Sequence, residues 1–199
     1  SSLLQRNFAV HAWSYIPNFD HQLQANQAWK QFRQSRKILE QRVGFKAKSI
    51  RLGHSLGCKL HLLSPDGGRN CDGLVAISFN NFKAGKSIPL LKRMSLKLNF
   101  QTEFSPSPAE TLNLIRDHYN QKNNLLIKFK NDNLDQSDLL LKSLKMRPFD
   151  KSKILQFKGN HLTPASLGLR GKLPKSNFQK PLKYETLDLI VDQIIHLQI

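Results

Sequence analysis

Cysteine is scarce in this sequence, and several classes of protein are excluded by what the chain lacks. Two cysteines, Cys58 and Cys71, are too few for a disulfide framework and lack the CxxC or Cys/His spacing of a zinc site. We therefore predict a reducing compartment, with no metal and no cofactor. No apolar run approaches the roughly 20 residues that a membrane helix needs, and no secretory signal opens the chain. The sequence predicts neither a transmembrane segment nor export.

Acidic side chains are also few. The chain has 14 Asp and Glu against 31 Lys and Arg, which gives a net charge of +17. Such a surface attracts anions, among them nucleic acid, acidic proteins and lipid headgroups. The basic residues are spread along the whole chain instead of forming one tail. Two interpretations stay open: a solvated basic surface with weak, salt-sensitive partners, or specific binding of an acidic protein or an RNA-containing assembly.

Predicted strands and helices alternate along the 199 residues, a length that suits a single domain over residues 1–199. Strands are predicted at 7–14, 48–53, 72–79, 125–129 and 153–157, and helices at 21–42, 56–63, 107–119, 137–146 and 184–197. In the first of these helices, the apolar positions Leu23, Trp29, Phe32, Ile38 and Leu39 are predicted to form a narrow buried stripe. The alternation is typical of an α/β fold, with a mostly parallel sheet and helices on both faces. Residues 81–120 are less regular and predict a cap-like insertion.

The pentapeptide Gly53-His54-Ser55-Leu56-Gly57 fits the pattern G-x-S-x-G. Between a strand and a helix, this pattern turns the backbone sharply and presents the serine hydroxyl outside the sheet. Ser55 is therefore the predicted nucleophile, and the N–H of Leu56 is the predicted donor to an oxyanion. The alternative is a glycine-rich turn without chemistry.

A serine nucleophile needs a histidine base and an acid that orients the base, each placed after a later strand. Asp132 follows the predicted strand 125–129, and His161 follows the predicted strand 153–157, which gives the chain order Ser, Asp, His of α/β-hydrolases. Asp135, in the same loop, is the alternative acid. Asp132, Asp135 and His161 are also ordinary turn or cap residues in an interpretation without chemistry. The remaining histidines, His54 among them, are interpreted as surface or packing residues.

Several blocks of the sequence resemble an uncharacterised family of α/β-hydrolase-like proteins from cyanobacteria and plastids, known as domain of unknown function 1350. The similar blocks lie at 19–22, 53–62, 77–82, 104–111, 126–132 and 159–164. The resemblance implies the α/β-hydrolase fold and a plastid (chloroplast) setting, soluble or peripheral, with no settled substrate. It also implies early strands and a Gly-rich loop before residues 7–14, and we expect neither within residues 1–199. We therefore expect a truncated α/β-hydrolase-like domain that is missing the N-terminal strands.

This departure leaves two functional hypotheses open. The absent loop normally supplies a second oxyanion donor, whose loss costs roughly 3 kcal/mol of transition-state stabilisation, and absent strands expose a sheet edge. The first hypothesis is a serine hydrolase that acts on an acyl ester or thioester. The second is a non-catalytic hydrolase-fold subunit that docks in a larger plastid assembly, photosynthetic or ribonucleoprotein, through its basic surface. A free nucleic-acid binder is a minor third, since no RNA-binding signature is present.

Overall fold

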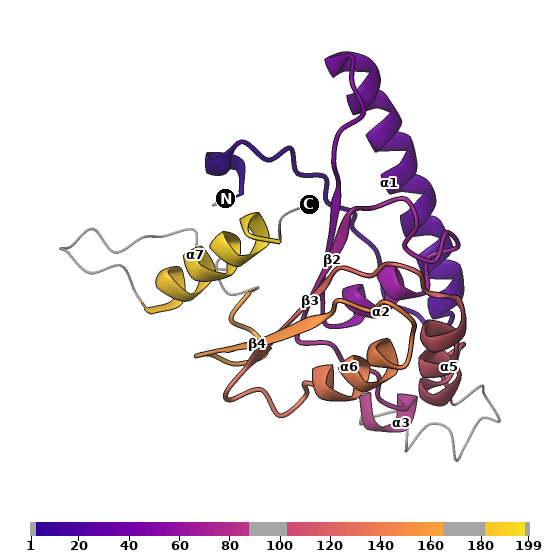
Figure 1. Ribbon diagram of the computed structural model, residues 1–199. Helices are drawn as coiled ribbons and strands as arrows, with labels where there is room; N and C mark the ends of the chain where they lie inside the picture. Colours follow the sequence, from indigo (N-terminus) through magenta and orange to yellow (C-terminus); the bar gives the residue numbers. More distant parts are fainter. Residues whose placement is uncertain (1–2, 88–102, 165–181, 198–199) are drawn as a thin grey trace.

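A parallel four-stranded sheet forms the centre of the computed structural model, which describes residues 3–87, 103–164 and 182–197 (Figure 1). The strands lie across the sheet in chain order: β1 (Ile50–His54), β2 (Gly73–Ile77), β3 (Asn124–Phe129) and β4 (Lys153–Phe157). Each neighbouring pair is parallel. The predicted α/β class with a parallel sheet is confirmed.

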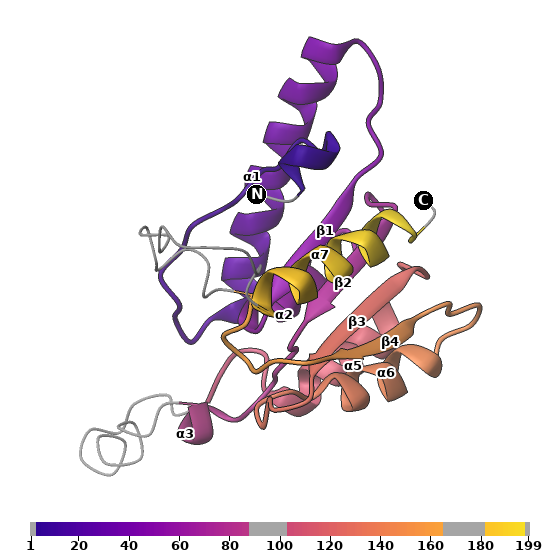
Figure 2. The same cartoon turned by 90° about the vertical axis from the view of Figure 1, so that its left-hand side faces the viewer.

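Helices cover both faces of the sheet (Figures 1 and 2). One face packs against α2 (Leu56–Leu62), α5 (Pro108–His118) and α6 (Ser137–Lys145), and the other against α7 (Leu182–Ile195). A short helix, α3 (Ala84–Ser87), precedes α5.

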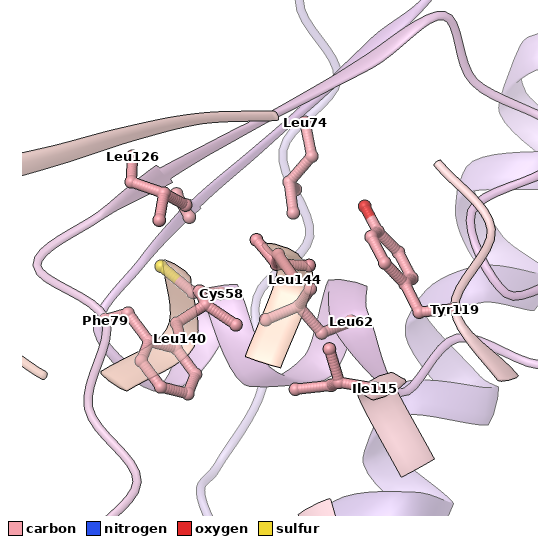
Figure 3. Packing of buried hydrophobic residues seen from close by; sticks show 10 residues of the cluster. Cys58, Leu62, Leu74, Phe79, Ile115, Tyr119, Leu126, Leu140 and Leu144 are labelled. Carbon is pink, nitrogen blue, oxygen red and sulfur yellow. The ribbon is translucent and has the colours of Figure 1, made fainter. Parts of the chain in front are cut away.

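The central strands β2 and β3 are mostly apolar because both of their faces are buried. Leu74 and Leu126 point to the α2, α5 and α6 side, while Val75 and Ile127 point to the α7 side. Figure 3 shows the first of these two clusters, in which Leu74 and Leu126 reach from the sheet toward the helical layer. This packing on both faces fixes the positions of the strand ends relative to one another.

The helix α5 begins as the sequence predicts. The Ser107 side chain accepts a hydrogen bond from the Glu110 N–H, the Glu110 side chain accepts one from the Ser107 N–H, and Pro108 occupies the first turn. Ile115 and Tyr119 belong to the buried core, so this part of the expected cap-like insertion at 81–120 is part of the main body. Residues 88–102 of that insertion lie outside the described residues, and the cap stays a prediction.

The helix α1 (His21–Val43) lies where it was predicted, but its buried side differs. Its buried residues are His21, Gln24, Ala25 and Ala28, whereas Leu23 and Ile38 of the expected stripe are exposed. Leu23 lies off the stripe of buried positions, which faces the body, while Ile38 lies in the later turns, which project from the body (Figures 1 and 2). In the described part of the chain, no helix is both long enough and apolar enough to span a membrane.

The predicted strand at 7–14 is wrong. A 3-10 helix, η1 (Leu4–Arg6), is followed by irregular backbone that is mostly exposed. Its apolar residues pack on helices α1 and α2 instead of pairing with the sheet. Trp13 and Tyr15 contact the cluster of Ala25, Leu60 and Leu63. Apolar composition alone therefore did not identify a strand.

Candidate active site

Four polar side chains lie just beyond the carboxyl ends of the four strands. Ser55 follows β1, Asn80 follows β2, Asp132 follows β3 and His161 follows β4. Because parallel strands end at the same edge of a sheet, their following loops meet there, and this edge is where open α/β sheets bind ligands.

The backbone turns sharply at Ser55, between β1 and α2. Ser55 has φ 56° and ψ −122°, a conformation that a residue with a side chain rarely adopts. Its N–H donates a hydrogen bond of 2.9 Å to the carbonyl oxygen of Ile77, on the neighbouring strand. The turn therefore lifts the hydroxyl out of the sheet while the backbone stays attached to β2.

The hydroxyl of Ser55 meets the imidazole of His161. Nε2 of His161 lies 3.1 Å from Oγ of Ser55, and Nδ1 of His161 lies 2.9 Å from Oδ2 of Asp132. These distances are hydrogen-bond distances, so the structure brings Ser55, His161 and Asp132 into one chain of contacts. The residues come from positions 55, 132 and 161 and from three different loops.

The carboxylate of Asp132 has no exposed surface. Burial by itself would raise the pKa of Asp132, but the neighbouring hydroxyl of Ser78, the ring of His161 and the N–H of Leu134 outweigh it, and the pKa is lowered. The side chain is thus a carboxylate at neutral pH, which accepts hydrogen bonds and donates none. Nδ1 of His161 must therefore carry the proton that they share.

Asp135, the alternative acid, does not contact His161. It accepts hydrogen bonds from the backbone N–H and the hydroxyl of Ser137, at the beginning of α6. Burial raises its pKa. The structure assigns Asp135 to the start of the helix and leaves Asp132 beside the imidazole.

The His161 loop is tied to its neighbours on two sides. The N–H of Asn131 donates to the carbonyl oxygen of Gly159 at 3.0 Å, which joins this loop to that of Asp132. Nε2 of His54 lies 2.8 Å from the carbonyl oxygen of His161. Because a carbonyl only accepts, Nε2 of His54 carries a proton, and burial lowers the pKa of this ring. His54, predicted to be a surface or packing residue, therefore holds the backbone of His161.

Asn80 was not singled out by sequence reasoning. Its Nδ2 lies 2.7 Å from Oγ of Ser55, closer than the imidazole. The signal that could have found it is its position: like Asp132 and His161, it follows a strand within a few residues. Asparagine is so common in turns that this position alone carries little information.

The remaining requirement of acyl chemistry is a donor to the oxyanion. The N–H of Leu56 begins α2, so no carbonyl one turn earlier in the helix can accept it. Among the residues that the structure describes, no group of three or more His, Cys, Asp or Glu side chains is placed to hold a metal ion. The arrangement as it stands is suited to nucleophilic attack by a hydroxyl on a carbonyl.

Comparisons with known proteins agree with this architecture. A family model described as "Protein of unknown function (DUF1350)" matches residues 1–183. The solved monoacylglycerol lipase of Paleococcus ferrophilus is 14% identical and superposes with a TM-score of 0.51, over 86% of this chain and 75% of the lipase. This likeness shows that the chain has the α/β-hydrolase fold.

Other solved structures are similar at lower scores. An alpha/beta hydrolase from a sediment metagenome of the Mar Chica lagoon, Morocco, is 16% identical with a TM-score of 0.46, over 86% of this chain and 71% of that one. A thermophilic esterase from Thermogutta terrifontis is 12% identical with a TM-score of 0.45, over 94% of this chain and 76% of that one. No curated protein matches the sequence.

The two glycines of the G-x-S-x-G motif make a matched pair of variants. A Cβ at Gly53 would lie 2.6 Å from the backbone nitrogen of Cys58 and 2.6 Å from the carbonyl carbon of Gly57. At Gly57, apart from its two chain neighbours and the backbone of its own helix, no atom of the described residues lies within 4 Å of such a Cβ. We expect Gly53→Ala to lower the free energy of unfolding by about 3 kcal/mol, because backbone must move to admit the methyl group. Gly57→Ala should stay within about 0.5 kcal/mol of the wild type.

Urea denaturation of both variants measures the difference. Equal destabilisation by the two substitutions would contradict the close approach of Gly53 to the first turn of α2.

Proposed function

The chain belongs to the DUF1350 family, proteins of unknown function, and from the geometry of its site we propose that it is a serine hydrolase of acyl esters or thioesters. The observation that carries the proposal is the chain of contacts in which Ser55 meets His161 at 3.1 Å and His161 meets Asp132 at 2.9 Å. A nucleophile, a base and an orienting acid in this order are what acyl transfer to a hydroxyl requires.

In the first half-reaction, Oγ of Ser55 attacks the carbonyl carbon of the substrate. Its proton passes to Nε2 of His161, and the Asp132 carboxylate stabilises the imidazolium that forms. The carbonyl oxygen becomes an oxyanion, toward which Leu56 can donate its N–H. Collapse of the tetrahedral intermediate breaks the bond to the leaving alcohol or thiol, which takes the proton from Nε2.

In the second half-reaction, a water molecule attacks the acyl group on Ser55. His161 accepts a proton from the water at Nε2 and then returns it to Oγ as the acyl bond breaks. The products are a carboxylic acid and the free serine. His161 therefore acts as a base and then as an acid in each half, and Asp132 fixes the ring in the tautomer that both halves need.

The partners of the protein and its compartment are also proposals. A net charge of +17 favours acidic proteins or RNA-containing assemblies as partners. The family resemblance suggests a plastid, where a catalytically silent docking subunit is the competing function.

A fluorophosphonate probe separates the two functions, because it reacts with a serine only when that serine is activated. We expect the wild-type protein to be labelled, and Ser55→Ala to lose all labelling. Ser14→Ala removes an exposed serine and is the matched control, which should label like the wild type. Intact-protein mass spectrometry measures the adduct, and hydrolysis of p-nitrophenyl esters of increasing acyl length measures turnover.

If the wild-type protein forms no adduct and cleaves none of the acyl esters or thioesters tested, the hydrolase hypothesis is contradicted and the docking subunit is the function that is left. An adduct that persists in Ser55→Ala would place the reactive serine elsewhere.

The two aspartates of one loop provide a second test. Asp132→Asn replaces the carboxylate that fixes the His161 tautomer, so we expect the rate of labelling to fall by roughly 10³- to 10⁴-fold. Asp135→Asn keeps an acceptor for Ser137 and should label near the wild-type rate. Stopped-flow or quenched labelling gives both rates. If Asp135→Asn were the slower variant, the assignment of the acid would be reversed.

A further inference from the structure

Asn80 is presented to the site by a loop whose backbone is held on both sides. Phe79, which precedes it, is fully buried, and its carbonyl oxygen accepts a hydrogen bond of 2.7 Å from the Gln136 N–H. The N–H of Asn81, which follows it, donates to Oε1 of Gln136 at 2.6 Å. Gln136 thus forms hydrogen bonds with the backbone on both sides of Asn80. These bonds fix the backbone that directs the side-chain amide of Asn80 toward Ser55.

The charge state of Asp132 sets the direction of the hydrogen bonds at the serine hydroxyl. Asp132 is a carboxylate, so His161 donates from Nδ1, and the neutral ring can only accept at Nε2. The hydroxyl of Ser55 must then donate its single proton to Nε2. Oγ has only lone pairs left for Asn80, which donates to it from Nδ2 at 2.7 Å.

We propose that Asn80 is a catalytic residue whose side-chain N–H stabilises the negative charge that develops on Oγ of Ser55. This assignment rests on the proposed hydrolase function. As the proton leaves Oγ for Nε2, negative charge builds on Oγ within reach of the amide. The bond that forms from Oγ to the substrate carbon then passes this charge to the carbonyl oxygen. When the acyl bond later breaks, its electron pair returns to Oγ, and the same N–H stabilises this charge as His161 reprotonates the oxygen.

An amide is chemically suited to this position. It donates at Oγ and is not ionised in this pH range, so it neither competes with His161 for the proton nor adds a charge beside the imidazole. The bond also spans 25 residues of sequence, whereas an asparagine that only shapes a turn bonds to backbone two residues away. The serine backbone is already fixed by Ile77, so the contact to Oγ is not needed to hold the turn.

Two substitutions remove the donor in different ways. Asn80→Ala deletes the amide, and Asn80→Asp keeps its size and shape but replaces the donor by an acceptor that attracts the serine proton away from His161. Asn113→Ala is the matched control, since Asn113 is an exposed asparagine on α5. Thermal unfolding of all three variants checks that the fold is retained.

We expect Asn80→Ala to lower the rate constant for fluorophosphonate labelling of Ser55 by roughly 100-fold, the effect of losing one donor to a developing oxyanion. Asn80→Asp should lose at least as much, and Asn113→Ala should match the wild type. In ester hydrolysis the loss should fall on kcat with KM near the wild-type value, because the interaction strengthens only as charge develops.

The outcomes separate this assignment from the proposed function. If the wild type is labelled and either Asn80→Ala or Asn80→Asp is labelled at the same rate, the role of Asn80 is overturned and the hydrolase function is not. A loss confined to KM overturns it as well, because the residue would then act in substrate binding. A wild type that is never labelled overturns the hydrolase, and the role of Asn80 with it.

Discussion

The turn of the backbone at Ser55 is the constraint on which the rest of the site depends. At φ 56° and ψ −122° a serine is strained, and strain of this kind persists only where the surroundings enforce it. Two contacts do so: the hydrogen bond from the Ser55 N–H to Ile77, and the direct approach of Gly53 to the backbone of Gly57 and Cys58. Both involve main chain, so they survive most side-chain changes. The hydroxyl is consequently placed by the sheet and the first turn of α2, and the imidazole only has to reach it.

The parallel sheet supplies the rest of the geometry. Its central strands are buried on both faces, by α2, α5 and α6 on one side and by α7 on the other, so the strand ends are fixed relative to one another. Four successive strands each deliver one polar side chain at the same edge. A buried carboxylate at Asp132 then sets the proton positions outward through His161 to Ser55, and leaves the lone pairs of Oγ for Asn80. The packing of the sheet, the burial of Asp132 and the direction of the hydrogen bonds thus together determine the environment of Oγ of Ser55.

Much of this could be predicted from the sequence because the signals are local. Alternating strands and helices, the capping box at Ser107 and the G-x-S-x-G turn each depend on a few neighbouring residues. Two failures were non-local. Residues 7–14 look like a strand, yet no strand of the described sheet pairs with them. In α1, Leu23 lies off the buried side of the helix, and Ile38 lies in the later turns, which project from the body. Asn80 was missed for a similar reason: asparagine is ordinary in a turn, and only the fold brings this one to Ser55.

The direction of the hydrogen bonds at His161 is the most direct test of this account, and it needs no substrate. Nitrogen-15 NMR of histidine-labelled protein at neutral pH reports which ring nitrogen carries the proton. The account predicts that Nδ1 of His161 is protonated toward Asp132 and that Nε2 is bare and accepts from Ser55. A proton on Nε2 with Nδ1 bare would contradict it, because the imidazole could not then take the proton of the serine.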